Sequence, residues 1–196
     1  MKMRYIILLL FIAVTGFVSV AGAQTVAIKS NLLADALLNV NIGADMGLAP
    51  KWTIGATGQF NGWELSHNRS WKHWAVQPEL RYWFCDRFGG HFVGVHTHGG
   101  QFNVGGIDNG INLLGTHFSR LSDTRYQGWF VGAGLTYGYA WVLDRRWNLE
   151  AEIGIGYSYT HYDRFRCAGC GRKIETGNTH HYVGPTKAAV NLVYLF

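Results

Sequence analysis

The sequence has no second long hydrophobic segment and very little proline. Beyond the apolar residues near its start, none of the 196 residues belongs to the ~20-residue apolar run that a membrane-spanning helix needs. Only three residues are proline, whereas 26 are glycine and 15% are aromatic. Proline interrupts the hydrogen bonding of strands, and aromatic side chains are favoured in them. The composition therefore favours a β-sheet protein.

The N-terminal residues have the pattern of a secretory signal. Lys2 and Arg4 give a basic start, an apolar run follows, and the small residues Ala21–Ala23 form a cleavage site. The run is short for a spanning helix, so a cleaved signal is favoured over an uncleaved anchor. No cysteine follows the cleavage point, which argues against a lipoprotein anchor. We expect a signal peptide at residues 1–23 and one outer-membrane domain at residues 24–196.

Charge is also scarce and nearly balanced. The signal holds two of the 17 basic residues and none of the 12 acidic ones, so its removal lowers the net charge from +5 to +3. Such a small surplus is weak support for binding nucleic acid, and export argues further against it. We expect no nucleic-acid partner.

The segment Gly184–Phe196 shows the pattern that the rest of the chain repeats. Alternate side chains of a strand point to opposite faces. Here one face is aromatic and aliphatic, and the other carries Lys187 and Asn191. Such a strand suits the closure of a transmembrane barrel, where no strand edge can stay unpaired in lipid. The terminal Phe196 also resembles the recognition signal of bacterial outer-membrane barrels.

Eight runs of alternating polarity predict an all-β fold, an eight-stranded antiparallel up-and-down transmembrane β-barrel of the small outer-membrane type. Eight strands enclose an interior just wide enough for side chains, so an open diffusion pore is not expected. Pro78 falls inside one run, and we expect a local bulge there. The runs are Thr25–Ala34, Val40–Ala49, Trp52–Leu65, Trp71–Phe84, Gly90–Gly106, Tyr126–Leu143, Trp147–Arg164 and Gly184–Phe196.

A soluble ligand-binding calyx would alternate in the same way, with its apolar face turned inward. The placement of charge decides between the two. One face of the runs carries nearly all the charges together with many glycines, which suits a crowded interior, and the other face suits lipid. Buried charges must pair or become neutral, so we expect an ion-pair network that plugs the lumen, with acid–base catalysis or gating as the alternative. Its expected members are Lys29, Glu79, Arg81, Glu150, Glu152 and Lys187.

Several sequence blocks resemble one family. They include Lys29–Leu33, Trp74–Trp83, His96–Gly105, Trp147–Glu152 and Gly184–Ala189. This pattern resembles the Bacteroidota outer-membrane β-barrel family catalogued as domain of unknown function 3575, over essentially the whole mature chain. The resemblance implies an outer-membrane barrel that is often encoded near fimbria-related genes. It implies no established activity, so no catalytic residue is carried over.

Cys167 and Cys170 form the sharpest local motif. Such a pair can form a disulfide in an oxidising compartment, or hold half of a tetrahedral zinc site that His180 and His181 would complete. The disulfide is favoured because one pair is only half of the usual zinc pattern. A redox-active pair ranks third, since its usual helix is absent.

His96 and His98 share the charged face of one run, two residues apart. They are weak candidates for metal binding, because interior histidines are more often hydrogen-bonded core groups. No cofactor is expected, apart from the zinc that Cys167 and Cys170 would hold in the less favoured reading.

The sequence favours a structural or interaction protein of the bacterial outer membrane over an enzyme. We expect membrane lipid around the barrel and a surface, envelope or fimbrial protein partner at the loops Ile107–Arg125 and Arg166–His180. Two alternatives stay open: a membrane-embedded enzyme that acts on lipid or glycan, and a channel for a small solute or a metal.

Overall fold

The computed structural model describes residues 26–62, 64–65, 69–105, 112–113, 116–117, 125–166 and 171–196. The expected signal peptide, Cys167, Cys170 and most of the expected loop at 107–125 lie outside these ranges. Among the described residues, no helix is long and apolar enough to cross a bilayer.

The described chain is built almost entirely of strands. Besides the long strands there are three two-residue strands and one short helix. The elements are β1 (Val26–Asn31), α2 (Leu32–Ala36), β2 (Val40–Ala49), β3 (Trp52–Asn61), β4 (Glu64–Leu65), β5 (Arg69–Trp83), β6 (Gly90–Gly105), β7 (Asn112–Leu113), β8 (Thr116–His117), β9 (Arg125–Val142), β10 (Trp147–Phe165) and β11 (Lys173–Leu195).

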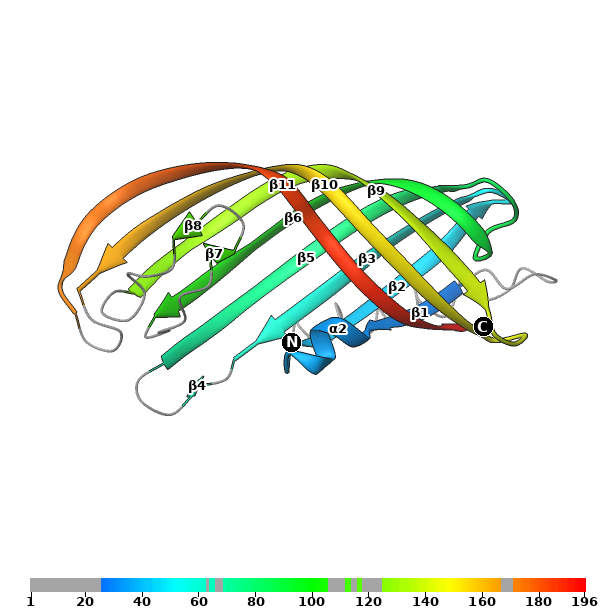
Figure 1. Ribbon diagram of the computed structural model, residues 1–196, viewed down its shortest axis with the longest axis horizontal. Coiled ribbons are helices and arrows are strands. Elements are labelled where there is room, and N and C mark those ends of the chain that lie inside the picture. Colours follow the sequence, from blue (N-terminus) through cyan, green and yellow to red (C-terminus); the bar gives the residue numbers. More distant parts are fainter. Residues whose placement is uncertain are drawn as a thin grey trace, which may run out of the picture.

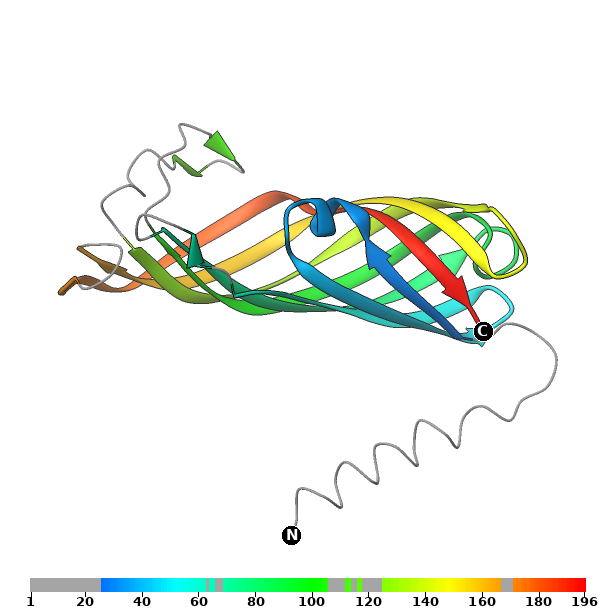
Figure 2. The same cartoon turned by 90° about the horizontal axis from the view of Figure 1, so that it is seen from below.

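Eight of the described strands pair in a closed antiparallel ring. Each long strand pairs with the next one along the chain, β3 pairs with β5, and β11 returns to pair with β1. Figures 1 and 2 show the barrel wall from two sides, with the tight turns after β2, β5 and β9 gathered near the C-terminus. This confirms the predicted eight-stranded barrel fold.

The ring closes with an offset. Lys29 pairs with Val193 directly across the β1–β11 seam. The paired residues can also be followed from Lys29 in the opposite direction around the ring, through Gly43 on β2, Thr57 on β3 and the remaining strands. This path reaches β11 at Tyr182, not at Val193. Closing a sheet into a barrel requires such a stagger together with inclined strands.

The two faces of the wall have opposite chemistry. On β10, Glu150 and Glu152 are buried, whereas Ile153 and Ile155 on the other face are 61% and 62% exposed. The same alternation holds on β9, where Leu135 is 63% exposed and Thr136 is buried. Polar side chains therefore fill the interior, and large apolar side chains cover the outside.

The first strand is shorter than the sequence predicts. The expected strand Thr25–Ala34 ends at Asn31, and the helix α2 follows. The Asn31 carboxamide oxygen accepts a hydrogen bond from the Leu33 N–H at 3.1 Å, which is the geometry of a helix N-cap. A capping asparagine inside an otherwise alternating run therefore ends the strand.

The last strand is longer than expected. It begins at Lys173, not at Gly184, so much of the expected loop Arg166–His180 is strand. Its first nine residues, 173–181, are polar on both faces apart from Ile174 and include Gly177 at φ +76°, which hides the alternation. A bulge opposite Gly154 and Ile155 places the neighbours Thr186 and Lys187 both toward the interior.

The bulge expected at Pro78 is absent. Pro78 opposes Ala56 on β3 in an unbroken register. On the other side, Val76 opposes Gly99 and Glu79 opposes His96, so the register with β6 is the same before and after the proline. The missing N–H interrupts the ladder between these pairs without inserting a residue.

The wall has unequal height around the ring. Figures 1 and 2 show α2 near the middle of the long axis, while β9, β10 and β11 continue to the end opposite the tight turns. We call that end the far rim.

Asn31 is expected to stabilise the pairing of β1 with β11 at the point where β1 ends and α2 begins. Asn31→Ala removes both the helix cap and the carboxamide oxygen that accepts from the Val190 N–H at 3.2 Å. We expect the free energy of unfolding to fall by about 1–3 kcal/mol. Urea titration followed by tryptophan fluorescence measures this, with Asn178→Ala, which removes one exposed hydrogen bond to Glu175, as the control. Equal losses in the two variants would contradict the assignment.

Candidate functional site

Seven charged side chains from five strands meet inside the barrel, and we call them the lumen ion cluster. Six are buried, and the side chain of the seventh, Lys187, is 7% exposed. The members are Lys29 of β1, Asp45 of β2, Glu79 and Arg81 of β5, Glu150 and Glu152 of β10, and Lys187 of β11.

Arg81 occupies the centre of the cluster and binds four carboxylates. Its Nε lies 2.6 Å from Glu79 Oε2, and its Nη2 lies 2.9 Å from Glu152 Oε2. Its Nη1 lies 3.2 Å from both Asp45 Oδ2 and Glu150 Oε2. A planar guanidinium with five donors can engage several acceptors at once, which a lysine cannot. Arg81 therefore ties together β2, β5 and β10.

The two lysines complete the pairing at the sides of Arg81. Lys29 Nζ lies 2.8 Å from Asp45 Oδ2. Lys187 Nζ lies 2.7 Å from Glu79 Oε2 and 3.1 Å from Glu152 Oε1. Every carboxylate of the cluster thus contacts a cation. Removing charges from water costs several kcal/mol for each ion, so this degree of pairing is what lets the cluster stay in the interior.

Glycines on the neighbouring strands make room for the charged side chains. A Cβ at Gly55 would overlap the Asp45 carboxylate, and a Cβ at Gly94 would stand 3.0 Å from Glu79 Oε1. The strand faces that carry the charges need glycine beside them, which explains why the sequence places the two together.

An aromatic layer lies between the lumen ion cluster and the tight turns. The Trp83 ring centroid is 4.7 Å from that of Phe92 and 5.9 Å from that of Phe88, and all three residues are buried. The Trp83 Nε1–H donates to Thr53 Oγ1 at 3.0 Å. The Arg81 guanidinium stacks 4.8 Å from the centroid of Phe92. An ionic layer and an aromatic layer thus fill the barrel in series.

His96 lies on the other side of the cluster and is fully hydrogen-bonded. Its Nδ1 is 2.8 Å from Thr136 Oγ1, and its Nε2 is 2.9 Å from Thr186 Oγ1. The ring centroid of His98 is 5.8 Å away. Because both nitrogens of His96 are engaged by threonines, His96 and His98 do not offer a paired metal site in this arrangement. The described residues contain no group of three or more His, Cys, Asp or Glu side chains that could hold a metal ion.

His180 and His181 lie on β11 and are both exposed. As neighbours on a strand they point to opposite faces, and His181 Nδ1 lies 2.5 Å from the Tyr157 hydroxyl. Cys85 is exposed and free in the turn after β5. The structure therefore does not bring the two histidines onto one face.

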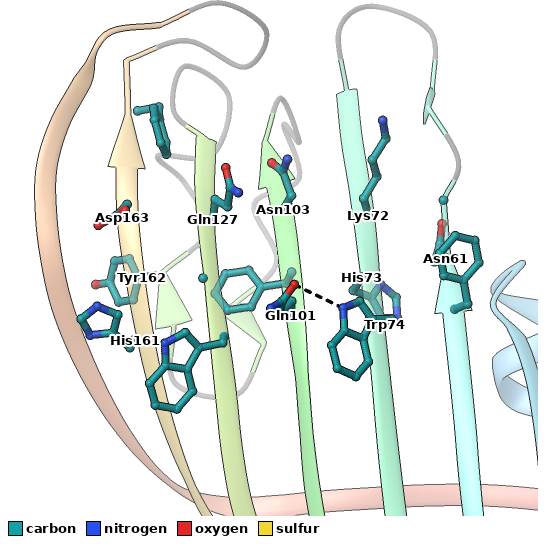
Figure 3. Close-up of a pocket in the computed structure, with 16 residues that line it drawn as sticks. Asn61, Lys72, His73, Trp74, Gln101, Asn103, Gln127, His161, Tyr162 and Asp163 are labelled. Atoms are coloured by element: carbon teal, nitrogen blue, oxygen red, sulfur yellow. Dashed lines mark hydrogen bonds between the residues drawn. The ribbon is translucent and has the colours of Figure 1, made fainter. Parts of the chain in front are cut away.

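A hollow of about 470 Å³ lies near the far rim. Part of its lining is a row of side chains at successive positions across five strands: Phe60, Trp74, Gln101, Trp129 and His161. Figure 3 shows the Trp74 indole directed at the Gln101 side chain, with Nε1 to Oε1 at 3.4 Å. The Trp129 and His161 rings are 5.8 Å apart. An aromatic row with polar tips is typical of a membrane–water interface.

The predicted network left out two residues of the interior, Asp45 and Asn191, although the alternation puts both on polar strand faces. Asp45 has the same strand parity as Asn41 and Gly43, so its inward direction was readable, but it stands alone in an otherwise uncharged run. Asn191 donates to Glu152 Oε1 at 2.9 Å, and its role depends on a partner strand that the local pattern does not reveal.

A family profile described as "Protein of unknown function (DUF3575)" matches residues 6–196. The chain belongs to this family, as the resemblance indicated. Searches of curated proteins and of solved structures gave no significant match. Family membership brings no activity with it, so function has to be argued from the barrel itself.

Removal of the Arg81 guanidinium should lower the free energy of unfolding much more than removal of a guanidinium near the far rim. Arg81→Met leaves four buried carboxylates to two lysines, and we expect a loss of about 3–5 kcal/mol in the free energy of unfolding. Arg164→Met, which removes a partly exposed pair with Glu175, should cost less than about 1 kcal/mol. Urea unfolding in lipid vesicles measures both.

Arg81→Lys serves as a second variant if Arg81→Met does not fold. It keeps the charge and loses the planar fork, so it should fold and show an intermediate loss. Similar small losses for Arg81→Met and Arg164→Met would contradict the central role of Arg81.

Proposed function

We propose that this protein is an integral outer-membrane β-barrel with a closed lumen, which serves as an anchored scaffold at the cell surface. The observation that carries the proposal is the reversed polarity of the wall. Charges pair inside, while exposed leucine, isoleucine, valine and aromatic side chains cover the outside. Exposed apolar patches larger than a few hundred Å² are rare on soluble monomers, so a continuous apolar exterior favours lipid.

The height of the apolar exterior supports the same proposal. Trp129 and Trp141 stand at the two ends of the exposed face of β9. The strand between them covers about 40 Å at ~3.3 Å per residue, or about 28 Å of height at a tilt near 45°, close to the ~25 Å apolar band of such barrels.

Aromatic side chains gather at both ends of this band. Near the tight turns, Trp52 contacts Tyr82 and Trp147 contacts Tyr194, with ring centroids 5.1 Å and 5.0 Å apart. Toward the far rim, Trp129 contacts Tyr159 at 5.7 Å. Girdles of this kind flank the lipid-facing band of outer-membrane barrels.

The filled lumen favours a scaffold over a channel. The lumen ion cluster and the aromatic layer occupy successive levels of the interior, and their members come from six of the eight strands of the ring. The same pairing argues against the enzyme alternative, because the carboxylates that would act as acid and base are each held by a cation. The remaining role is to hold the far rim at the surface, where the resemblance suggests an envelope or fimbrial partner.

Leu135→Arg tests the lipid contact. Leu135 is 63% exposed, and an arginine there should change the stability of a water-soluble protein by less than about 0.5 kcal/mol. At the middle of a bilayer it should cost about 2–4 kcal/mol. Reversible urea unfolding in vesicles measures the difference, with Thr176→Arg on the hairpin near the far rim as the matched control. A Leu135→Arg cost no larger than that of the control would overturn the proposal.

Planar-bilayer recording tests the closed lumen. The mature chain should show no stable single-channel current, because two layers of side chains block the interior. Regular conductance steps from the purified wild-type protein would contradict a plugged barrel and support the channel alternative.

A further inference from the structure

The seam that closes the barrel is short. β1 pairs with β11 from Ala27 opposite Leu195 to Asn31 opposite Asn191, and the chain then turns into α2. The Asn31 side chain extends the pairing slightly: its carboxamide nitrogen donates to the Ala188 carbonyl at 3.5 Å, and its oxygen accepts from the Val190 N–H. Beyond this point no element among the described residues continues the ladder.

β11 runs on well past the seam. From Ala188 back to Lys173 it pairs with β10 on one side, and within the described part of the chain no strand pairs with its other side. Val183 is 76% exposed, more than any other large hydrophobic residue described. Figures 1 and 2 show this part of β11 arching beyond α2 as the border of the sheet. We call residues 179–185 of this border the β11 edge.

The hydrogen bonds of the seam determine the direction of the backbone groups on the β11 edge. The Ala188 carbonyl and the Val190 N–H point toward the seam side. The bulge between Lys187 and Pro185 shifts this alternation by one residue, so Pro185 faces the open side. Proline is tolerated in a sheet where its missing N–H faces an unpaired edge. Alternate residues point the same way, so the N–H groups of Val183, His181 and Thr179 also face the open side.

We propose that the β11 edge binds an extended, acidic segment of another polypeptide as an added antiparallel strand. An unpaired row of donors and acceptors is a template for such pairing. Part of this edge lies level with the aromatic side chains Tyr157 and Tyr159, where unpaired backbone groups would border lipid at a cost of several kcal/mol each. A bound strand satisfies these groups.

The charge of the hairpin end specifies an acidic partner. In the described residues 163–166 and 171–175, four cations stand against two carboxylates, a net charge of +2. The pairs Arg164–Glu175 and Lys173–Asp163 account for two of the cations. The other two, Arg166 and Arg172, are exposed and have no acidic partner among the described residues. Complementary charge steers and orients a binding segment.

A second copy of this chain fits the edge poorly. In one bilayer, two barrels present β11 in the same direction, so contact between the two edges would be parallel. Every pair in this sheet is antiparallel. A separate segment that runs opposite to β11 keeps the pattern that β1 begins.

This inference rests on the proposed function, since it names the surface through which the scaffold would bind its partner. The test uses the isotope-labelled mature chain in lipid nanodiscs and a capped peptide of alternating threonine and glutamate. The peptide is about fourteen residues long, so that at ~3.3 Å per residue it can pair along residues 179–185 and still reach Arg172. We expect the amide protons of Thr179, His181 and Val183 to shift on titration, in the direction of new hydrogen bonds. Those of His180 and Tyr182, which face β10, should shift less.

Two control peptides separate strand pairing from simple charge attraction. The same peptide with alternate backbone nitrogens methylated on its pairing side keeps its charge and loses its donors, so it should bind at least about tenfold more weakly. A peptide with lysine in place of glutamate should also bind at least about tenfold more weakly at low salt. Equal binding of the methylated peptide would overturn the strand-addition proposal.

Variants of the protein provide a matched pair. Val183→Pro removes one donor from the open side and leaves the β10 ladder intact, so it should abolish the alternating shifts. Val183→Thr keeps the backbone donor and should retain them. If the strand-addition proposal alone is wrong, the chain will still be folded in the nanodisc, but the peptide will shift no amide of the β11 edge or will shift amides elsewhere. A chain that does not insert at all would instead contradict the proposed function.

Discussion

Arg81 stabilises the interior of the barrel through its contacts with four carboxylates, and the other interior layers are arranged around it. A strand that shows an apolar face to its surroundings shows its other face to the lumen, and eight strands leave little space there. Polar side chains on the inner face must then supply one another's hydrogen-bond partners and counter-charges. Arg81 does so for Asp45, Glu79, Glu150 and Glu152 at distances of 2.6–3.2 Å. Without it, four buried carboxylates would be left to two lysines.

The order of layers inside the barrel follows from that centre. The cation of Arg81 lies against the face of Phe92, which joins the ionic layer to the aromatic one. On the opposite side, His96 is held between two threonines from β9 and β11. The bulge in β11 allows Thr186 and Lys187 to contribute to two layers at once. The same bulge also decides which residues of the β11 edge turn their N–H groups to the open side, because it shifts the alternation by one residue and places Pro185 there.

Much of this fold is readable from the sequence, and the failures have local causes. The strand faces and six members of the lumen ion cluster follow from alternation, because charge and glycine share one parity. Asp45 escaped notice because one acid in an uncharged run gives no periodic signal. The early end of β1 depends on a single capping contact of Asn31. The extra length of β11 is a tertiary effect, since its polar half is ordered by pairing with β10 and not by its own pattern.

We propose that the outer face of the wall contacts acyl chains and that the charged side chains contact only one another. Nuclear Overhauser effects between lipid methylene protons and the labelled mature chain in nanodiscs distinguish the two faces. We expect strong effects at Ile153 and Ile155, and none at Glu150 or Glu152 of the same strand. Effects from bulk water at Ile153 and Ile155, with no transfer from lipid, would show that the outer face is not in a bilayer.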